Sequence, residues 1–355
     1  MKYDFLILGF GETNSSWTNP QWMAHTLASN GYKVAYLNPP AYRKIYLRDF
    51  KRIFKRIFLL KKNKNEINFE IFNSFSNNQF PLKLLNKFEN KKITKLINSS
   101  KNILCFQPLW TKFFELPVDN TTFLICDDYS SLKNSSTDQK KYDKLVAKRF
   151  SKIIVTHKNL KKKYKNAFFT SNCVPTSYFE EKNNELLKNK IKKQVCFVGA
   201  IHKEKIDMDL IFHLVETNSD HNFIFAGKLF GFNQSDLPKA NNFSYVGELS
   251  YLKASSLMKS SEYGLIPFKK NNYTKNVFSM KYFEYIAAFT NPISTKLEMY
   301  NSLSNNLMPN QFIEDNIKIN SFKNENLDQI RVEVLKNFSY QSRIQTMINN
   351  KFIQV

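Results

Sequence analysis

Short apolar segments alternate with amphipathic ones along most of this chain, and this alternation constrains the fold more than any other feature of the sequence. Apolar runs of this length, bounded by polar turns, are typical of buried strands. When strands alternate with helices, the strands form a parallel sheet that helices cover on both faces. We therefore predict an α/β fold, with a first series of strands at residues 3–9, 33–38, 102–107, 122–126 and 152–156.

A second series of the same kind follows after an interruption. Residues 171–193 are polar, contain a proline and then a run of charged side chains, so we interpret them as a linker. Further strands are predicted at residues 194–199, 222–226, 243–246 and 263–267. A chain of 355 residues is long enough for two domains of ordinary size. The sequence thus predicts two doubly wound, Rossmann-like domains.

Residues 276–300 carry the clearest indication of a binding site. Lys281 and Glu284 are expected on the first turns of a helix that follows the strand at 263–267 and a polar loop. Helix N-terminal amides and a nearby ammonium favour phosphate, while a carboxylate three residues further on shares the helical face and can accept both ribose hydroxyls. The pair suits a nucleotide-diphosphate sugar. The same spacing also occurs in ordinary surface ion pairs.

The sequence around this pair resembles the C-terminal half of the GT-B glycosyltransferases, specifically the retaining, family 4-like group that builds capsule, teichuronic acid and lipopolysaccharide chains. The similar segments occur in the family's order: FVGAIHKEKIDMDLIFHLVE (197–216), FIFAGK (223–228), NNFSYVGELSYLKASSLMKSSEYGLIPF (241–268) and MKYFEYIAAF (280–289). Residues 17–43 resemble the opening strand–helix–strand of these enzymes, and residues 338–348 resemble their closing helix.

This resemblance implies the GT-B fold, in which a cleft separates two Rossmann-like domains. Residues 1–170 would form the acceptor-side domain, and 171–193 the linker. Residues 194–325 would bind the nucleotide sugar, and 326–355 would form a helix that packs back toward the N-terminal domain.

The candidate donor-binding residues besides Lys281 and Glu284 follow predicted strands. Gly199 ends the FVG strand, and His202 lies in the next loop, from which it would reach the diphosphate or sugar, or else the surface. Lys205 is the nearest basic side chain able to contact phosphate, and a solvated lysine is the alternative. Gly11 follows the first strand, whose carboxyl end faces the ligand cleft in a doubly wound domain. A simple turn is the other interpretation of that glycine.

Four positions depart from the family's pattern. Asn276 stands where a glutamate is common, and Ser279 where a helix-starting proline is usual. Ala200 replaces a frequent arginine. Phe289 replaces a glycine in the turn after the helix, and because glycine permits close backbone approach, we expect a different loop path there.

Asp127 and Asp128 are the candidate catalytic residues. They follow the strand TTFLIC, so their carboxylates are expected at the carboxyl edge of the first sheet, facing the cleft. Related chains often have an acidic pair here, and one carboxylate would orient an acceptor hydroxyl or act as a base. The alternative for Asp128 is a capping or turn role. His157 begins a helix-like segment and is expected to be a cap residue.

The net charge of +23 is concentrated in residues 43–64, which contain ten Lys or Arg and one acid. Large apolar side chains recur there at helical spacing with basic ones between them, as in helices that lie in a membrane interface. A core-facing helix with a solvated basic face is the alternative. Nucleic acid is a less favoured partner, because no recognition motif is present. The predicted membrane-binding residues are Arg48, Lys51, Arg52, Lys55 and Arg56, with Phe50 and Phe54.

The remaining composition points to the cytoplasm. The cysteines Cys105, Cys126, Cys173 and Cys196 are widely spaced and mostly in apolar runs, so we expect reduced, buried thiols and no zinc site. We see neither a signal peptide nor a membrane span, and therefore expect a peripheral protein on the inner face of the cell membrane.

Together these features predict a glycosyltransferase that moves a sugar from a nucleotide-sugar donor to a membrane-associated, lipid-linked or other glycan acceptor in cell-surface polysaccharide synthesis. We expect no metal and no cofactor, because helix dipoles and basic side chains neutralise the leaving diphosphate in this fold. A GT-B-fold sugar-nucleotide epimerase and a noncatalytic assembly protein of the same fold remain as alternatives.

Overall fold

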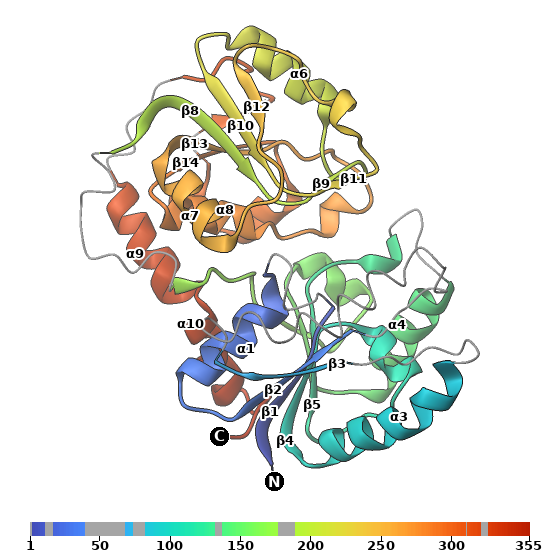
Figure 1. Ribbon diagram of the computed structural model, residues 1–355. Coiled ribbons are helices and arrows are strands. Elements are labelled where there is room, and N and C mark those ends of the chain that lie inside the picture. The colour runs from blue at the N-terminus through green and yellow to red at the C-terminus, as the bar shows by residue number, and fades with distance from the viewer. Residues whose placement is uncertain are drawn as a thin grey trace.

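The structure, a computed structural model, describes residues 2–10, 17–39, 68–73, 82–131, 137–176, 189–309, 311–320 and 326–355. Two α/β domains, each built on a parallel sheet, are stacked one above the other (Figure 1). The predicted fold of two parallel-sheet domains is confirmed. In the described ranges, none of the helices has the length and hydropathy of a membrane-spanning segment.

The first sheet has seven parallel strands in the order β3-β2-β1-β4-β5-β6-β7. The order reverses between β1 and β4, and ligands bind at such switch points, beyond the carboxyl ends of the strands. The strands are β1 (Tyr3–Leu8), β2 (Val34–Asn38), β3 (Glu70–Asn73), β4 (Ser100–Cys105), β5 (Thr121–Ile125), β6 (Ile153–Val155) and β7 (Phe168–Phe169).

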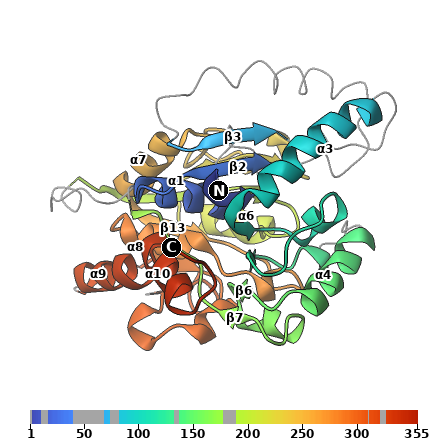
Figure 2. The ribbon, with the colours of Figure 1, turned by 90° about the horizontal axis from the view of Figure 1, so that it is seen from below.

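Helices cover both faces of this sheet. On one face lie α3 (Leu82–Asn98) and α4 (Thr137–Arg149). On the other face α1 (Asn19–Ser29) packs beside α10 (Tyr340–Asn349), at the opposite end of the chain (Figure 2). Side chains of β1 alternate between the two cores, with Leu6 and Leu8 in one and Phe5 and Ile7 in the other. The C-terminal helix therefore completes the core of the first domain.

The second sheet has six parallel strands in the order β12-β10-β8-β13-β14-β15, with its switch point between β8 and β13. A two-stranded sheet, β9 (Ile201–His202) with β11 (Leu229–Phe230), lies beyond the ends of β8 and β10. The six strands are β8 (Ile191–Val198), β10 (Asn222–Ala226), β12 (Phe243–Tyr245), β13 (Ser261–Ile266), β14 (Asn291–Ser294) and β15 (Gln311–Phe312). The accompanying helices are α6 (Met208–Thr217), α7 (Tyr251–Ser260), α8 (Met280–Ala287) and α9 (Leu327–Asn337).

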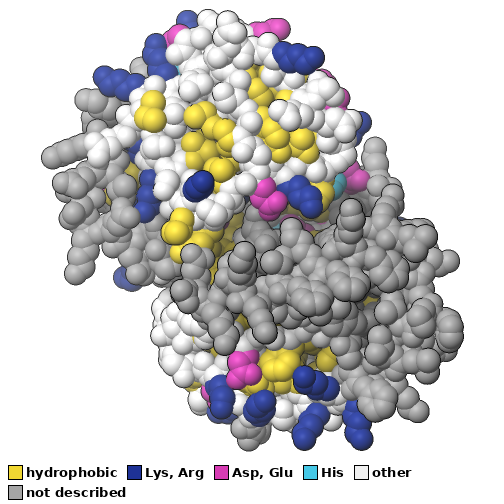
Figure 3. All heavy atoms as spheres, in the orientation of Figure 1, with side chains coloured by type: hydrophobic (Ala, Val, Ile, Leu, Met, Phe, Trp, Pro, Cys, Tyr) yellow, Lys and Arg dark blue, Asp and Glu magenta, His cyan; other side chains and the backbone are white. Residues whose placement is uncertain are grey.

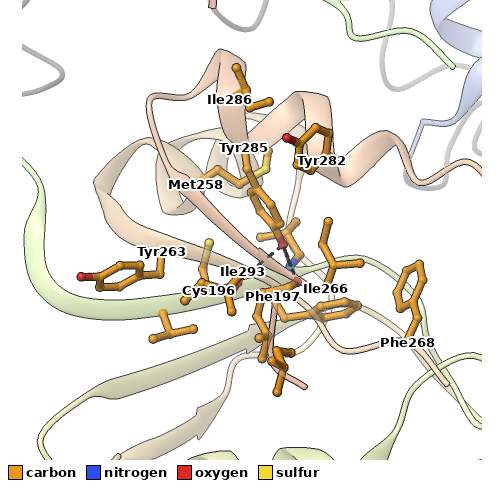
Figure 4. Close-up of a cluster of buried hydrophobic side chains, with 14 of the residues drawn as sticks. Cys196, Phe197, Met258, Tyr263, Ile266, Phe268, Tyr282, Tyr285, Ile286 and Ile293 are labelled. Carbon is orange, nitrogen blue, oxygen red and sulfur yellow. Dashed lines mark hydrogen bonds between the residues drawn. The ribbon is translucent and has the colours of Figure 1, made fainter. Parts of the chain in front are cut away.

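Tyr285 fixes α8 against the second sheet. Its ring points from the helix into the buried cluster over β8 and β13 (Figure 4), and its hydroxyl bonds the carbonyl of Leu265 at 3.3 Å. A Cβ atom added to Gly264 would lie 2.3 Å from Cγ of Tyr285, so the glycine leaves room for the ring. This contact sets the position of the helix that carries Lys281 and Glu284.

Several strands of the structure were not predicted: β3, β7, β9, β11, β14 and β15. They are short, and β14 contains a proline, so none of them has a long apolar run. Residues 43–64, with all seven predicted membrane-binding side chains, and Gly11 lie outside the described residues. So does part of the predicted linker, residues 177–188.

Candidate functional site

The carboxyl ends of β8 and β10 form a close backbone contact next to the switch point of the second sheet. Gly227 has a φ of +144°, and a Cβ atom on it would lie 1.8 Å from the carbonyl oxygen of Gly199. A residue with a side chain at 227 is therefore excluded. Gly199 in turn lies against the stem of Lys281, whose Cε would be 3.2 Å from a Cβ placed on Gly199.

Lys281 and Glu284 lie in the first turns of α8, as ion-paired neighbours. Glu284 is buried and Lys281 is partly exposed, so the pair is not an ordinary surface contact. The N-cap residue, Ser279, makes no side-chain hydrogen bond to the first-turn amides. These amides therefore present positive charge at the start of α8, and the ammonium of Lys281, paired with Glu284, lies in the same turns.

Lys205 of the second domain and Asp127 of the first interact electrostatically. Both are partly buried, and burial raises the pKa of Asp127 to about 6 against the opposing effect of the Lys205 cation and a hydrogen bond from Tyr129. Burial also lowers the pKa of Lys205, and the Lys281 cation adds to that effect. The Lys205 ammonium lies 4.6 Å from the centre of the Phe268 ring. The charge of Lys205 thus affects the pKa of Asp127, and the charges of Asp127 and Lys281 affect the pKa of Lys205.

Asp128 points into a different network from Asp127, although the two are adjacent. Its carboxylate accepts hydrogen bonds from Ser130 and Ser131 and forms an ion pair with Lys163. Lys163 also contacts Asp143 at 3.3 Å. Burial alone would raise the pKa of Asp128, but the bonds from Lys163 and the two serines outweigh it and hold that pKa below its usual range. Asp128 is therefore an anchored, ionised side chain, whereas Asp127 has fewer partners.

The loop from β13 to α8 makes the contacts that join the two domains beside these carboxylates. Asn276 donates from Nδ2 to Oδ2 of Asp128 at 3.1 Å. Asn159 donates to the carbonyl of Lys275 at 3.2 Å, and Asn172 to that of Phe278 at 2.6 Å. Acidic, basic and histidine side chains meet where the domains adjoin in Figure 3.

A second contact between the domains is aromatic. The ring of Trp17, which precedes α1, stacks on Tyr251 of α7 with 6.2 Å between centroids. Trp22 meets the same tyrosine edge-on at 5.2 Å. This contact and the polar loop flank the junction, so the orientation of the domains is held at two places.

The remaining candidates lie further from this centre. His202 stacks on Phe230 with 5.8 Å between ring centroids, and its Nδ1 accepts from the amide of Glu204. Burial lowers the pKa of His202. His157 is the N-cap of its short helix and accepts from the amide of Asn159, so the predicted cap role is confirmed. The four cysteines are free and buried.

The arrangement includes side chains that the sequence did not single out. Tyr129 bonds Asp127, and Lys163 neutralises Asp128. Lys163 belongs to a run of lysines, and no pattern in that run marks the one that reaches the carboxylate. Within the described ranges, no His, Cys, Asp and Glu side chains are grouped as a set of three that can hold a metal ion.

The structure is similar to solved glycosyltransferase-type structures over nearly its whole length. HepE of Anabaena, in complex with UDP and glucose, is 12% identical, with 98% of this chain and 99% of HepE covered and a TM-score of 0.66. Sucrose-phosphate synthase of Thermosynechococcus elongatus is 9% identical, with 98% of each chain covered and a TM-score of 0.66. A glycosyltransferase of Rickettsia africae is 13% identical, with 99% of each chain covered and a TM-score of 0.59.

These neighbours show that the chain has the GT-B fold. No family model matches the sequence. A search of curated proteins gave no match either.

Proposed function

We propose that this protein is a glycosyltransferase that transfers a sugar from a nucleotide-sugar donor to a glycan acceptor. The observation that carries the proposal is that Lys281, beside Gly199 at the end of β8, Lys205 and Asp127 of the first domain interact electrostatically with one another. Two cations suit the donor's diphosphate, and a carboxylate from the opposite domain suits an acceptor hydroxyl. This is the arrangement that transfer between two bound substrates requires.

The proposed chemistry assigns one role to each group. The amides at the start of α8 and the ammonium groups of Lys281 and Lys205 bind the diphosphate and neutralise the charge that develops as its bond to the sugar breaks. Glu284 accepts hydrogen bonds from the ribose. Asp127 accepts the hydrogen bond of the attacking hydroxyl, because the carboxylate of Asp128 is already fully engaged. Neither step requires a metal ion.

One precedent for the donor is a uridine nucleotide, because HepE was solved with UDP and with UDP-glucose. A thermal-shift screen of UDP, GDP, ADP and CDP and their sugars tests this, since a ligand that binds the native state raises the melting temperature by mass action. Binding of one nucleotide family supports the proposal. Turnover of the sugar nucleotide without any acceptor would point to an epimerase, and failure to bind any nucleotide to a noncatalytic protein.

We further propose that transfer is retaining and that the acceptor is a membrane-associated, lipid-linked glycan of cell-surface polysaccharide synthesis. The support is the family resemblance and the ten basic side chains of residues 43–64. Anionic lipid attracts each basic residue near the surface by about 1 kcal/mol. Cosedimentation with anionic vesicles tests the membrane part. Replacing Lys51, Arg52, Lys55 and Arg56 with glutamine is expected to leave the protein in the supernatant.

A further inference from the structure

A polar cavity lies between the domains and includes Asp128 and its partners from the site described above. It has a volume of about 810 Å³, which is the size of a small-molecule site. Helix α4 and its neighbours form one wall, and the loop before α8 forms the other. The lining residues are Asp128, Ser130, Ser131, Lys140, Asp143, Lys144, Lys163, Asn272, Lys275 and Asn276.

The charges on this wall are unequal, with four lysines and two aspartates. Lys163 contacts both Asp128 and Asp143, and its one charge balances one of these two carboxylates. Over the whole lining the four lysines exceed the two aspartates by two charges. Lys140 and Lys144 lie four residues apart on one face of α4, and in the part of the chain that the structure describes no hydrogen bond or ion pair engages either ammonium. The ammonium of the third lysine, Lys275, contacts the amide oxygen of Asn272 at 2.9 Å. The cavity therefore has a surplus of positive charge.

The rest of the lining suits a sugar. The hydroxyl of Ser131 and the side-chain amide of Asn272 are the kinds of partner that bind sugar hydroxyls. Asp128 also connects this cavity to Asp127, the residue before it. A glycan in the cavity would thus have one end beside the proposed site of transfer.

We propose that the acceptor glycan carries a negatively charged group, a carboxylate or a phosphate ester, that Lys140, Lys144 and Lys275 bind in this cavity. The inference rests on the proposed function, because it concerns the acceptor of that transfer. Three ammonium groups from two domains surround the anion. Its binding therefore also joins α4 to the loop that precedes α8.

The test uses the full chain with the nucleoside diphosphate found in the screen at saturating concentration, so that the donor site is closed to other anions. Glucuronic acid, glucose 6-phosphate and neutral glucose are titrated by ligand-observed NMR at physiological ionic strength. We expect at least one charged sugar to bind at least tenfold more tightly than glucose. A preference for glucuronic acid assigns a carboxylate, and a preference for glucose 6-phosphate assigns a phosphate ester.

Two double variants with the same change in net charge show where the anion binds. Lys140→Gln with Lys144→Gln should weaken the charged sugar at least fivefold. Lys141→Gln with Lys148→Gln, on the same helix outside the cavity, should change its affinity less than twofold. Nucleotide affinity should be unchanged in both.

Equal binding of charged and neutral sugars, or equal losses in the two double variants, would overturn the inference. If the protein binds no nucleoside diphosphate, that result contradicts the proposed function rather than the charge of the acceptor. The two failures are therefore distinguishable.

Discussion

Asn276 of the second domain donates a hydrogen bond to Asp128 of the first, with 3.1 Å between Nδ2 and Oδ2. Both side chains are buried. The family that this sequence resembles commonly has a glutamate at the asparagine's position. A carboxylate there would oppose that of Asp128, whereas an amide donates to it. Asparagine therefore suits this position because its amide can donate to the Asp128 carboxylate across the domain junction.

Changing Asn276→Asp should destabilise the protein by about 1 kcal/mol more than Asn276→Ala, because a second carboxylate repels Asp128 while alanine only removes a bond. The reversed pair, Asn276→Asp with Asp128→Asn, should recover part of that loss. Urea denaturation of these three variants and of Asp128→Asn alone measures the coupling. Additive effects in the double variant would show that the two side chains do not interact.

The rate of transfer should fall as the pH drops below about 6, because the pKa of Asp127 is about 6 and only the ionised carboxylate accepts the hydroxyl's hydrogen bond. The Lys205 cation lowers that pKa, so Lys205→Met should move the acidic limb to higher pH. Lys203→Met removes an exposed charge nearby and should leave the limb in place. Profiles of kcat/KM against pH check this. An unshifted limb in Lys205→Met would contradict the pairing.

Substitutions on α8 should distinguish the residue that binds the diphosphate from the residue that binds the ribose. Lys281→Met should weaken nucleoside diphosphates more than the nucleoside, because it removes charge opposite phosphate. Glu284→Gln should weaken both by roughly 1.5–3 kcal/mol, the net strength of a hydrogen bond to a charged group. Calorimetry with both ligands measures the losses. If Lys281→Met weakens the two equally, the lysine serves only to hold Glu284.

The parts of this site that could be predicted are those encoded by local spacing. Lys281 and Glu284 are three residues apart, and the glycine and acidic residues follow apolar runs that become β8 and β5. Strands such as β1 and β13 were predictable for the same reason, since both are buried almost throughout. Edge strands such as β3, with an exposed glutamate and partly buried neighbours, lack that signal.

The unpredicted parts depend on contacts between distant residues. Asn276 and Asp128 are 148 positions apart, and their bond exists only when the domains are in contact. The division of roles between Asp127 and Asp128 depends on which way each side chain leaves the strand end and on Lys163, 35 residues further on. No periodicity in either segment contains this information.

The turn after α8 keeps the backbone path that a glycine would allow, although we expected Phe289 to force a different one. The residue has a φ of 56°, the left-handed conformation that glycine favours. The amides of Phe289 and Thr290 bond the carbonyls of Ile286 and Tyr285, which is a Schellman cap. The phenylalanine thus retains a glycine-type conformation while its buried ring stacks with Arg331 at 4.4 Å.

Phe289→Ala and Phe289→Gly should both destabilise the protein, because both remove the ring, but glycine should be the more stable of the two by about 1 kcal/mol since it avoids the left-handed penalty. Thermal unfolding of both variants measures the difference. At the preceding residue, Ala288→Gly should be destabilising, because φ there is −84°. If alanine proves as stable as glycine at position 289, the turn has relaxed out of this conformation.

Lys190 should make stability rise with pH above neutrality. Its ammonium donates to the carbonyl of Ala288 and the hydroxyl of Thr290, both at 2.9 Å. Burial lowers its pKa from 10.5 to about 7. Between these values the unfolded chain holds a proton that the folded one has released, so the free energy of unfolding increases as the pH rises from 7 toward 10, by up to about 1.4 kcal/mol per pH unit. Below pH 7 both states are protonated, and this contribution becomes constant.

Urea denaturation at pH 7, 8 and 9 measures that slope. Lys190→Met should flatten it, because the group that titrates is gone, and the variant should be more stable than the wild type at pH 7, where part of the penalty for burying the charge remains. Lys192→Met, two residues away and exposed, should keep the wild-type slope. A slope that is the same in wild type and Lys190→Met would mean that the Lys190 ammonium stays solvated and charged in the folded state.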